Sequence, residues 1–256
     1  MPLAKVTARR VAFVTGASYG IGAASARALA ADGYDIAVAA THIDHLRNTV
    51  VGLEATGARV AAIAFDLRAQ GGIERAVVEV VRALGRIDVL VNNAGITLRR
   101  SAADITRAEW EAVMRTNVDG TFFMCQQMGR HLIATGRPGC IINMASANAF
   151  VGDAQRSAYG ISKAAIVHMT KMLAVEWAEH GIRVNAVAPG RVTSGSPMRA
   201  STARDPKHIA AVHARIPLKR SATCEEVAGA VRYLASPAAA YITGHALLLD
   251  GGLTAQ

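Results

Sequence analysis

The sequence contains few cysteines and no long apolar run. The cysteines Cys125, Cys140 and Cys224 are odd in number and far apart, and no C-x-x-C pair occurs. This spacing indicates neither a disulfide framework nor a zinc site and favours buried free thiols. No apolar run approaches the roughly 18 residues that a membrane helix needs, and the basic N-terminus leads only into the short stretch Val11–Val14. We therefore expect a protein without a membrane segment or an export signal, located in the cytoplasm.

Acidic residues are outnumbered by basic ones. The formal net charge is +9, yet the basic residues are interleaved with acids along most of the chain. Because no nucleic-acid recognition motif accompanies this charge, we expect a solvated surface and no nucleic-acid partner. The eight histidines include His42 and His45, but further ligand-type residues at useful spacing are missing. The sequence therefore predicts no metal site.

The hydrophobic pattern alternates between short apolar runs and longer segments of helical period. Such alternation is typical of parallel strands joined by crossover helices. The runs expected to form strands are Val11–Thr15, Ile36–Ala40, Val60–Phe65, Val89–Val91, Cys140–Met144, Arg183–Val187 and Leu247–Leu249. With 256 residues, 52% of them hydrophobic, the chain is long enough for one buried core. We predict a single α/β domain, residues 1–256: a Rossmann-type, doubly wound seven-stranded parallel sheet with helices on both faces.

A long segment after the sixth expected strand, Arg191–Pro206, has no clear regular pattern. Ligands of open α/β sheets bind outside the carboxyl ends of the strands, so the region of about 191–215 is a candidate substrate loop. A plain surface loop is the alternative. Basic residues crowd this region, namely Arg199, Arg204, Lys207, Arg215, Lys219 and Arg220. With Arg99 and Arg100 they indicate either an acidic or carrier-linked substrate or a merely solvated face.

A glycine-rich turn follows the first expected strand. The segment Thr15–Gly22, TGASYGIG, opens an alanine-rich helical stretch. Glycines permit a tight turn and a close approach of the backbone to a pyrophosphate, and the free N–H groups at a helix start attract phosphate charge. The spacing G-x-x-x-G-x-G is a variant of the dinucleotide-binding fingerprint, and its position after the first strand favours nucleotide binding.

Tyr159 and Lys163 are four residues apart at the start of a strongly helical stretch, so they share one helix face. An ammonium group beside a phenol favours the phenolate, which brings the acid/base group nearer neutrality than a free tyrosine with its pKa of about 10. Carbonyl reduction needs such a group, because the oxygen gains a proton as the carbon receives a hydride. Ser146 follows the strand Cys140–Met144 and is placed to hydrogen-bond the same oxygen. Y-x-x-x-K alone equally describes an ordinary surface pair.

These motifs occur in one order along the chain: TGxxxGIG at Thr15–Gly22, NNAG at Asn92–Gly95, Asn117, Ser146, Tyr159 with Lys163, Pro189-Gly190, and Asp250-Gly251-Gly252. Together they resemble the short-chain dehydrogenase/reductase family over nearly the whole chain. The resemblance implies Tyr159 as the catalytic acid/base and Lys163 as the residue that tunes its pKa and binds the nicotinamide ribose. It also implies that Ser146 orients the carbonyl and that Asn117 holds a water that relays protons from Lys163 to solvent.

The resemblance also implies a set of dinucleotide contacts. They are Gly16, Ser18, Tyr19, Gly20, Ile21, Gly22, Thr41, Asp66, Leu67, Asn93, Ala94, Gly95, Tyr159, Lys163, Pro189, Gly190, Val192 and Thr193. A preference for NAD usually rests on an acid at the end of the second strand, where this chain has Ala40 followed by Thr41. We therefore favour NADP over NAD, although Tyr19 stands where many NADPH-dependent relatives have arginine.

The expected activity is NAD(P)-dependent interconversion of a carbonyl and a secondary alcohol. A 3-oxoacyl reductase-like activity is the first expectation, and a dehydrogenase of sugars, polyols or other small alcohols is the alternative. A nucleotide-sensing protein without catalysis is a third reading, disfavoured by the complete set Asn117, Ser146, Tyr159 and Lys163. The resemblance also suggests a homotetramer built on the helices of Asn117 and Tyr159 and on the C-terminal tail.

Overall fold

A seven-stranded sheet forms the centre of the computed structural model, which describes residues 9–193 and 206–255. All its strand pairs are parallel, in the order β3-β2-β1-β4-β5-β6-β9. The strands are β1 (Val11–Thr15), β2 (Asp35–Ala40), β3 (Val60–Ala64), β4 (Val89–Asn92), β5 (Gly139–Met144), β6 (Ile182–Pro189) and β9 (Ala246–Leu249). The predicted Rossmann-type sheet is confirmed, with boundaries shifted by one or two residues in most strands.

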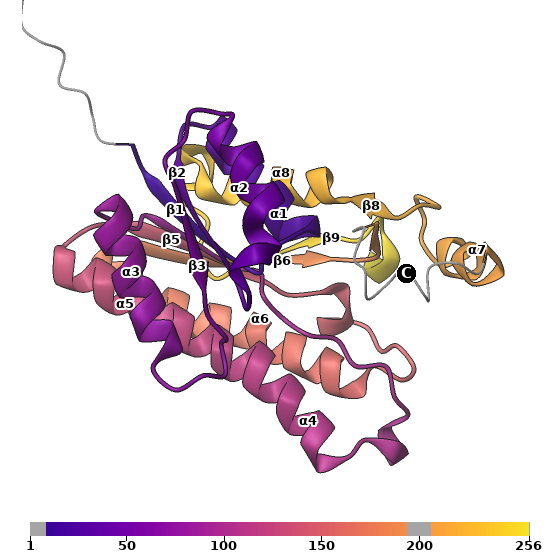
Figure 1. Ribbon diagram of the computed structural model, residues 1–256. Coiled ribbons are helices and arrows are strands. Elements are labelled where there is room, and N and C mark those ends of the chain that lie inside the picture. The colour runs from indigo at the N-terminus through magenta and orange to yellow at the C-terminus, as the bar shows by residue number, and fades with distance from the viewer. Residues whose placement is uncertain (1–8, 194–205, 256) are drawn as a thin grey trace, which may run out of the picture.

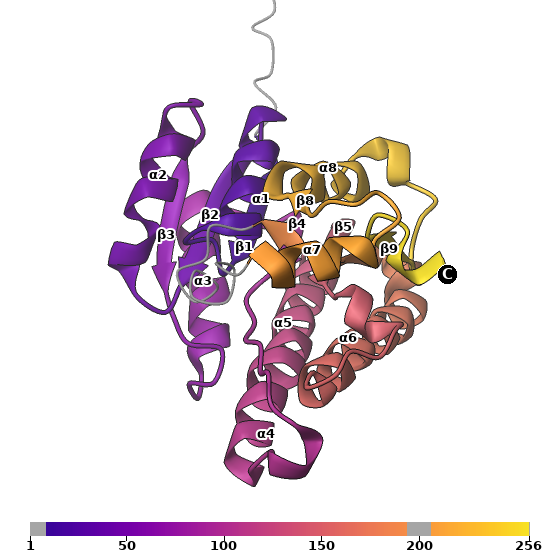
Figure 2. The same ribbon diagram turned by 90° about the vertical axis from the view of Figure 1, so that its right-hand side faces the viewer.

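Helices cover both faces of the sheet (Figures 1 and 2). One face is covered by α1 (Gly20–Ala31), α2 (Arg47–Glu54) and α8 (Cys224–Ala235), and the other by α3 (Gly72–Leu84), α4 (Arg107–Met114), α5 (Gly120–Thr135) and α6 (Ser157–Trp177). Short 3₁₀ turns span Ile43–Leu46, Ala102–Asp104, Ala147–Ala149, Ala178–His180, Pro237–Ala239 and Leu253–Ala255. The chain between α4 and α5, Arg115–Asp119, is a π-helical turn.

Strand β1 shows how the sheet separates two cores. Its residues are all buried, and successive side chains point to opposite faces. Val11 and Phe13 join the cluster beneath α3 and α5, whereas Ala12 and Val14 join the cluster beneath α1 and α8. A strand buried on both faces is a continuous apolar run, which is why the sequence revealed it clearly.

The sheet reverses its direction of growth between β1 and β4. Strands β2 and β3 lie on one side of β1, and the chain then crosses back so that β4 pairs with β1 on the other side. At such a switch point the loops leaving the two strands diverge, and the crevice between their carboxyl ends is the usual ligand position in open α/β sheets. The loops after β1 and β4 are the glycine turn and the NNAG segment.

A two-stranded parallel sheet lies beyond the carboxyl ends of the strands of the main sheet (Figure 1). It joins β7 (Val192–Thr193) to β8 (Ala222–Thr223), and α7 spans Pro206–Ala214. The expectation that the segment from Arg191 lacks regular structure is therefore wrong for Val192–Thr193. A strand of two residues has no detectable period, so its pairing had to come from tertiary structure. Residues 194–205, with Arg199 and Arg204, lie outside the described part.

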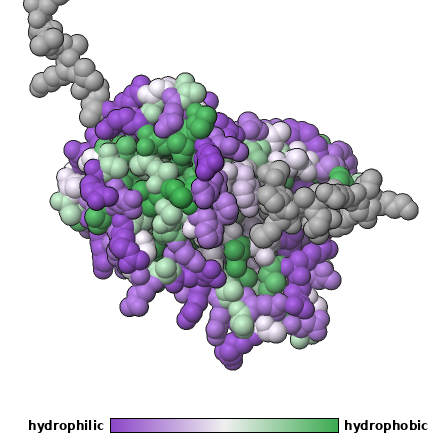
Figure 3. Space-filling model, viewed as in Figure 1, coloured by the Kyte–Doolittle hydropathy of each residue, from purple (hydrophilic) through white to green (hydrophobic). Residues whose placement is uncertain are grey.

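Hydrophobic side chains also occur on the surface. In Figure 3 they gather over α2 and the edge strand β3, between hydrophilic neighbours. Among the helices of residues 9–193 and 206–255, none is both long and apolar enough to cross a membrane.

Candidate active site

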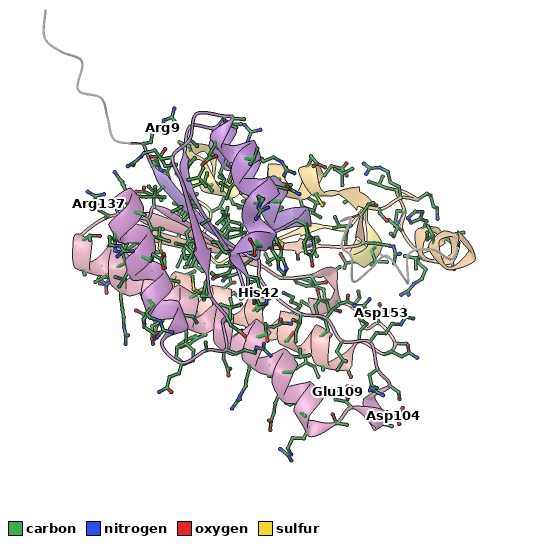
Figure 4. The ribbon with its side chains drawn as sticks, viewed as in Figure 1. Arg9, His42, Asp104, Glu109, Arg137 and Asp153 are labelled. Atoms are coloured by element: carbon green, nitrogen blue, oxygen red, sulfur yellow. The ribbon has the colours of Figure 1, made fainter. Side chains whose placement is uncertain are left out.

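Most of the predicted site residues follow the carboxyl ends of six neighbouring strands. Gly16–Gly22 follow β1, Thr41 follows β2, Asp66 and Leu67 follow β3, Asn93–Gly95 follow β4, Ser146 follows β5, and Gly190 follows β6. Figure 4 shows the same edge: His42 lies near the end of β2, Asp153 lies on a loop beyond it and Glu109 in helix α4, whereas Arg9 and Arg137 lie at the opposite end. The predicted residues of these six loops therefore lie together at one edge of the sheet.

The glycine turn is packed backbone against backbone on the NNAG segment. Gly16 has a φ of 62°, which strongly favours glycine. A Cβ on Gly16 would lie 2.7 Å from the Cα of Ala94, and one on Gly22 would lie 2.3 Å from the carbonyl oxygen of Gly16. Neither contact is tolerable for a side chain, so both positions require glycine.

Hydrogen bonds fasten the same two segments. The hydroxyl oxygen of Thr15 accepts from the backbone N–H groups of Asn93 and Ala94, each at 3.1 Å. The side-chain amide of Asn93 donates to the carbonyl oxygens of Thr15, at 3.1 Å, and Gly16, at 2.8 Å. The shape of the turn after β1 is therefore fixed by the residues after β4.

The first turn of α1 suits an anion. Tyr19 is the N-cap residue, and its side chain makes no capping hydrogen bond. The first turn holds no acidic residue. Helix starts carry N–H groups without intrahelical partners and a partial positive charge. The turn therefore fits the pyrophosphate of a dinucleotide, because no carboxylate on the helix competes for these donors.

Asn117 lies in the π-helical turn and is fully buried. Its side-chain oxygen accepts from the N–H of Ile96 at 2.9 Å, and its amide nitrogen donates to the Ile96 carbonyl at 2.9 Å and to the Ser162 hydroxyl at 3.0 Å. Both amide donors are therefore used by the protein. The residue ties the loop after β4 to helix α6, and π-helical turns are frequent at functional sites.

Lys163 and Tyr159 lie close together in the first turns of α6. The Lys163 Nζ is 5.7 Å from the centre of the Tyr159 ring and donates to the Met144 carbonyl at 2.7 Å. The lysine is 5% exposed, and this burial lowers the pKa of its ammonium group, while the negative charge of a Tyr159 phenolate acts in the opposite direction. The geometry thus places a buried cation beside the phenol.

Gly95 leaves room for this cation. A Cβ on Gly95 would lie 3.0 Å from Oδ1 of Asn117 and 3.6 Å from Nζ of Lys163. The loop after β4, the π-helical turn and α6 therefore meet at one point. Three of the predicted site residues, Gly95, Asn117 and Lys163, lie close together there.

Ser146 lies two residues after β5 and is the N-cap of the 3₁₀ turn Ala147–Ala149. Its hydroxyl oxygen accepts from the Asn148 N–H at 3.2 Å. The same turn packs on α6, since a Cβ on Gly160 would lie 3.1 Å from the Asn148 carbonyl oxygen. The serine is therefore held on the turn that contacts the helical turn of Tyr159.

The segment after β2, residues 40–47, offers a hydroxyl group and holds its carboxylate in an ion pair. Thr41 is exposed directly after Ala40, and the next acidic side chain, Asp44, pairs with Arg47 at 3.2 Å. Near the end of β3, Asp66 accepts two hydrogen bonds from the Arg68 guanidinium, which lowers the pKa of its carboxyl group. These carboxylates are thus each paired with an arginine of their own segment.

The far end of the expected cofactor groove lies at β6 and β7. The Gly190 N–H donates to the Leu249 carbonyl at 2.9 Å, and a Cβ on Gly190 would lie 2.9 Å from the Cα of Asp250. Pro189 belongs to β6 rather than following it, because the strand keeps pairing with β9 to its end. Val192 is buried and Thr193 exposed in β7.

Sequence reasoning did not identify three residues of this region. Thr15 precedes the glycines and was noted only as part of a motif, although it accepts two backbone N–H groups. Ser162 links Asn117 to the Tyr159 carbonyl, to which it donates at 2.7 Å. Arg156 lies against the Tyr159 ring. Its place three residues before the tyrosine, where it is the N-cap of the same helix, was the available signal.

Known proteins resemble this chain over almost its whole length. A family model described as enoyl-(acyl carrier protein) reductase matches residues 16–254. The 2-dehydro-3-deoxy-D-gluconate 5-dehydrogenase of Escherichia coli (strain K12) is 36% identical, covering 96% of this chain and 96% of that protein. The NAD-dependent glycerol dehydrogenase of Listeria innocua is 37% identical, covering 96% and 94%. A crystal structure of a gluconate 5-dehydrogenase from Burkholderia cenocepacia J2315 in complex with NADP and tartrate has a TM-score of 0.90 and 32% identity, covering 96% of each chain.

The fold, the residues at the carboxyl edge of the sheet and these similarities all point to the same family. The chain belongs to the short-chain dehydrogenase/reductase family. It is an enzyme, an NAD(P)-dependent oxidoreductase that interconverts a carbonyl and an alcohol, as the sequence predicted.

Proposed function

We propose that the enzyme oxidises a secondary alcohol of a small polyhydroxylated molecule, a sugar acid or a polyol, and reduces the corresponding ketone. The observation that supports the chemistry best is the buried ammonium of Lys163, 5.7 Å from the Tyr159 ring centre. The names of the relatives support the substrate class, since they are sugar-acid and polyol dehydrogenases. These names favour the alternative given above, a dehydrogenase of sugars or polyols, over a 3-oxoacyl reductase. The proposed catalytic residues would serve either activity.

Tyr159 is the proposed acid/base. During alcohol oxidation its phenolate accepts the proton of the substrate hydroxyl, and during reduction its hydroxyl returns that proton to the ketone oxygen. A bound nicotinamide dinucleotide would accept or supply the hydride. Lys163 stabilises the phenolate and offers its ammonium to the ribose hydroxyls, and Ser146 donates a hydrogen bond to the reacting oxygen. The residues at the ends of β1–β4 and β6 hold the dinucleotide.

Asn117 has a positioning role in this proposal. Its two amide donors hold the Ile96 carbonyl and the Ser162 hydroxyl, so they keep the loop after β4 against α6. The predicted proton-relay water remains a proposal, and it would bind an oxygen of this segment rather than the amide nitrogen. The whole chain, residues 1–256, acts as one catalytic domain in this proposal, and its cytoplasmic location stays a prediction.

A substrate panel tests the proposal. The purified protein is assayed by nicotinamide absorbance with gluconate, sorbitol, glycerol, acetoin and a 3-hydroxyacyl thioester, each with NADP⁺ and with NAD⁺. We expect the largest kcat/KM among the polyhydroxylated substrates. Faster turnover of the thioester than of every polyhydroxylated compound would contradict the proposed substrate class.

The same assay tests the cofactor. We propose a preference for NADP, supported by the exposed Thr41 after Ala40 and by the pairing of Asp44 with Arg47, which leaves no unpaired carboxylate on this stretch to repel the 2′-phosphate. The expected kcat/KM is at least about tenfold higher with NADP⁺. A value at least tenfold higher with NAD⁺ would overturn the preference.

We also propose a homotetramer. Large apolar side chains are exposed on α5 and α6 and, elsewhere, near the C-terminus: Phe122, Phe123, Ile133, Ile161, Met172, Val175, Tyr233, Tyr241 and Leu248. Such surfaces are typical of protein interfaces, and two self-complementary interfaces on one chain close into a tetramer.

Light scattering after gel filtration checks the assembly. We expect a tetramer, with four times the mass of the chain, for the wild type. The double variant Met172→Glu/Val175→Glu should be a dimer, because the two new carboxylates would be buried in one of the interfaces. Val51→Glu on α2, where the valine is 62% exposed, is the matched control and should leave the tetramer intact. A monomeric wild type would contradict the proposal.

A further inference from the structure

The 3₁₀ turn after β5, Ala147–Ala149, carries a second polar side chain beside Ser146. The Asn148 N–H donates to the Ser146 hydroxyl oxygen at 3.2 Å, and the Ala149 N–H donates to the Ser146 carbonyl oxygen at 2.9 Å. Both backbone N–H groups are therefore engaged within the turn, which fixes the backbone of Asn148 next to the serine.

Helix α6 holds the same turn from its other side. A Cβ on Gly160 would lie 3.1 Å from the carbonyl oxygen of Asn148 and 4.0 Å from its Cβ, so the helix and the turn are in close contact. Gly160 directly follows Tyr159. Asn148 therefore has a fixed position relative to both Ser146 and the helical turn of the proposed acid/base, and only its side chain is free to move.

The side-chain amide of Asn148 lies at the Ser146 hydroxyl group. Its Oδ1 is 3.4 Å from Oγ of Ser146, a long and therefore weak hydrogen bond between two oxygens. Within residues 9–193 and 206–255, its amide nitrogen has no hydrogen-bond partner. The residue is partly exposed. The amide thus retains two donors and most of its acceptor capacity for a molecule that is bound at Ser146.

An uncharged amide in this position is suited to a hydroxyl group. A hydroxyl group both donates and accepts hydrogen bonds, and the amide offers a donor and an acceptor side by side. A carboxylate or a phosphate would gain more from a charged partner, which an asparagine does not supply. In the proposed function the Ser146 hydroxyl donates to the reacting oxygen, so its long bond to Asn148 is given up. The amide then faces the group beside the reacting oxygen, which in a sugar acid or a polyol is the hydroxyl on the adjacent carbon.

We propose that Asn148 is a specificity-determining residue that hydrogen-bonds the hydroxyl group on the carbon next to the reacting carbon. The enzyme therefore prefers α-hydroxy ketones and vicinal diols to isolated ketones and alcohols. A substrate with a hydrogen atom in place of this hydroxyl covers the amide without bonding to it, and the unsatisfied amide lowers its kcat/KM. This inference rests on the proposed function, because that function places the reacting oxygen at Ser146 and Tyr159.

The test compares the reduction of acetoin with that of 2-butanone, its counterpart without the hydroxyl group, with NADPH as coenzyme. In the wild type we expect kcat/KM to be at least about tenfold higher for acetoin. In Asn148→Leu, which has a similar size but no hydrogen-bonding group, this ratio should fall about tenfold, through the value for acetoin. The kcat for 2-butanone should stay within about twofold of the wild type, because the backbone N–H that fixes Ser146 is retained.

Two further variants serve as controls. Asn148→Gln keeps the amide but moves it by one methylene group, and it should give an intermediate ratio. Asn48→Leu replaces an exposed asparagine on α2 and should leave the ratio unchanged. A thermal unfolding midpoint of Asn148→Leu close to that of the wild type shows that the ratio reports recognition rather than misfolding.

The outcomes separate the two claims. A wild type that does not reduce acetoin faster than 2-butanone, an unchanged ratio in Asn148→Leu, or an equal fall in Asn48→Leu overturns the role of Asn148. A parallel loss of kcat for both ketones in Asn148→Leu also overturns it, because the asparagine would then only hold Ser146 in place. The proposed function stands in each of these cases while polyhydroxylated substrates remain the best of the panel. A wild type that prefers the 3-hydroxyacyl thioester to all of them overturns the substrate class and the inference with it.

Discussion

Replacing Tyr159 with phenylalanine is expected to lower kcat by about 100-fold or more, a loss of at least about 2.7 kcal/mol of transition-state stabilisation. Phe retains the ring and its contacts with Arg156 and Lys163 but has no hydroxyl to exchange a proton. The affinity for the dinucleotide should change little, because its proposed contacts lie mainly on the loops after β1–β4. Steady-state kinetics and a fluorescence titration with NADPH measure the two effects separately.

Tyr241→Phe is the matched control for this variant. The side chain of Tyr241 is fully exposed, so loss of its hydroxyl should leave kcat within about twofold of the wild type. Turnover of Tyr159→Phe near the wild-type rate would exclude Tyr159 as the acid/base, and the enzyme's chemistry would have to be assigned to another group at this edge of the sheet.

Replacing Lys163 with methionine is expected to lower kcat by about 100-fold and also to weaken cofactor binding by about tenfold. Met has a similar length and fills the buried space, but it neither stabilises a phenolate nor donates to the Met144 carbonyl. The pH dependence of kcat should also change. Burial lowers the pKa of the Lys163 ammonium group, so the wild-type profile should include the ionisation of this group and the profile of the variant should lack it.

The pH profile distinguishes this role from simple structural damage. Lys171→Met on the same helix removes an exposed ammonium and should leave kcat, NADPH affinity and the pH profile unchanged. A Lys163→Met enzyme with reduced kcat but the pH profile of the wild type would show that Lys163 supports the helix and that its charge has no role in the reaction.

The parts of the fold that the sequence revealed are those with a strong local pattern. Strands such as β1 are buried on both faces and are therefore continuous apolar runs, and Tyr159 and Lys163 share a helix face by their spacing alone. The strand β6 was predicted two residues too short at its carboxyl end, because pairing with β9 rather than its own pattern carries it to Pro189.

The geometry around the site depends on contacts between distant segments and left little trace in the sequence. The two-residue strands β7 and β8 exist because they pair with each other. Arg156 follows Gln155, which has a positive φ. A glutamine in the sequence does not predict such a backbone conformation. The π-helical turn around Asn117 contains no proline or glycine between Arg115 and Asp119 that would mark an irregular helix.

The contact between the glycine turn and the NNAG segment has a consequence for stability. The hydrogen bonds from Asn93 to Thr15 span 78 positions of the chain, so the turn keeps its shape only while β1 and β4 stay paired. The proposed dinucleotide site includes this turn, so we expect any partial opening that separates these strands to abolish dinucleotide affinity, and a saturating dinucleotide to suppress that opening by mass action. In this proposal, occupancy by the coenzyme and resistance to proteases in the cell are coupled through the middle of the sheet.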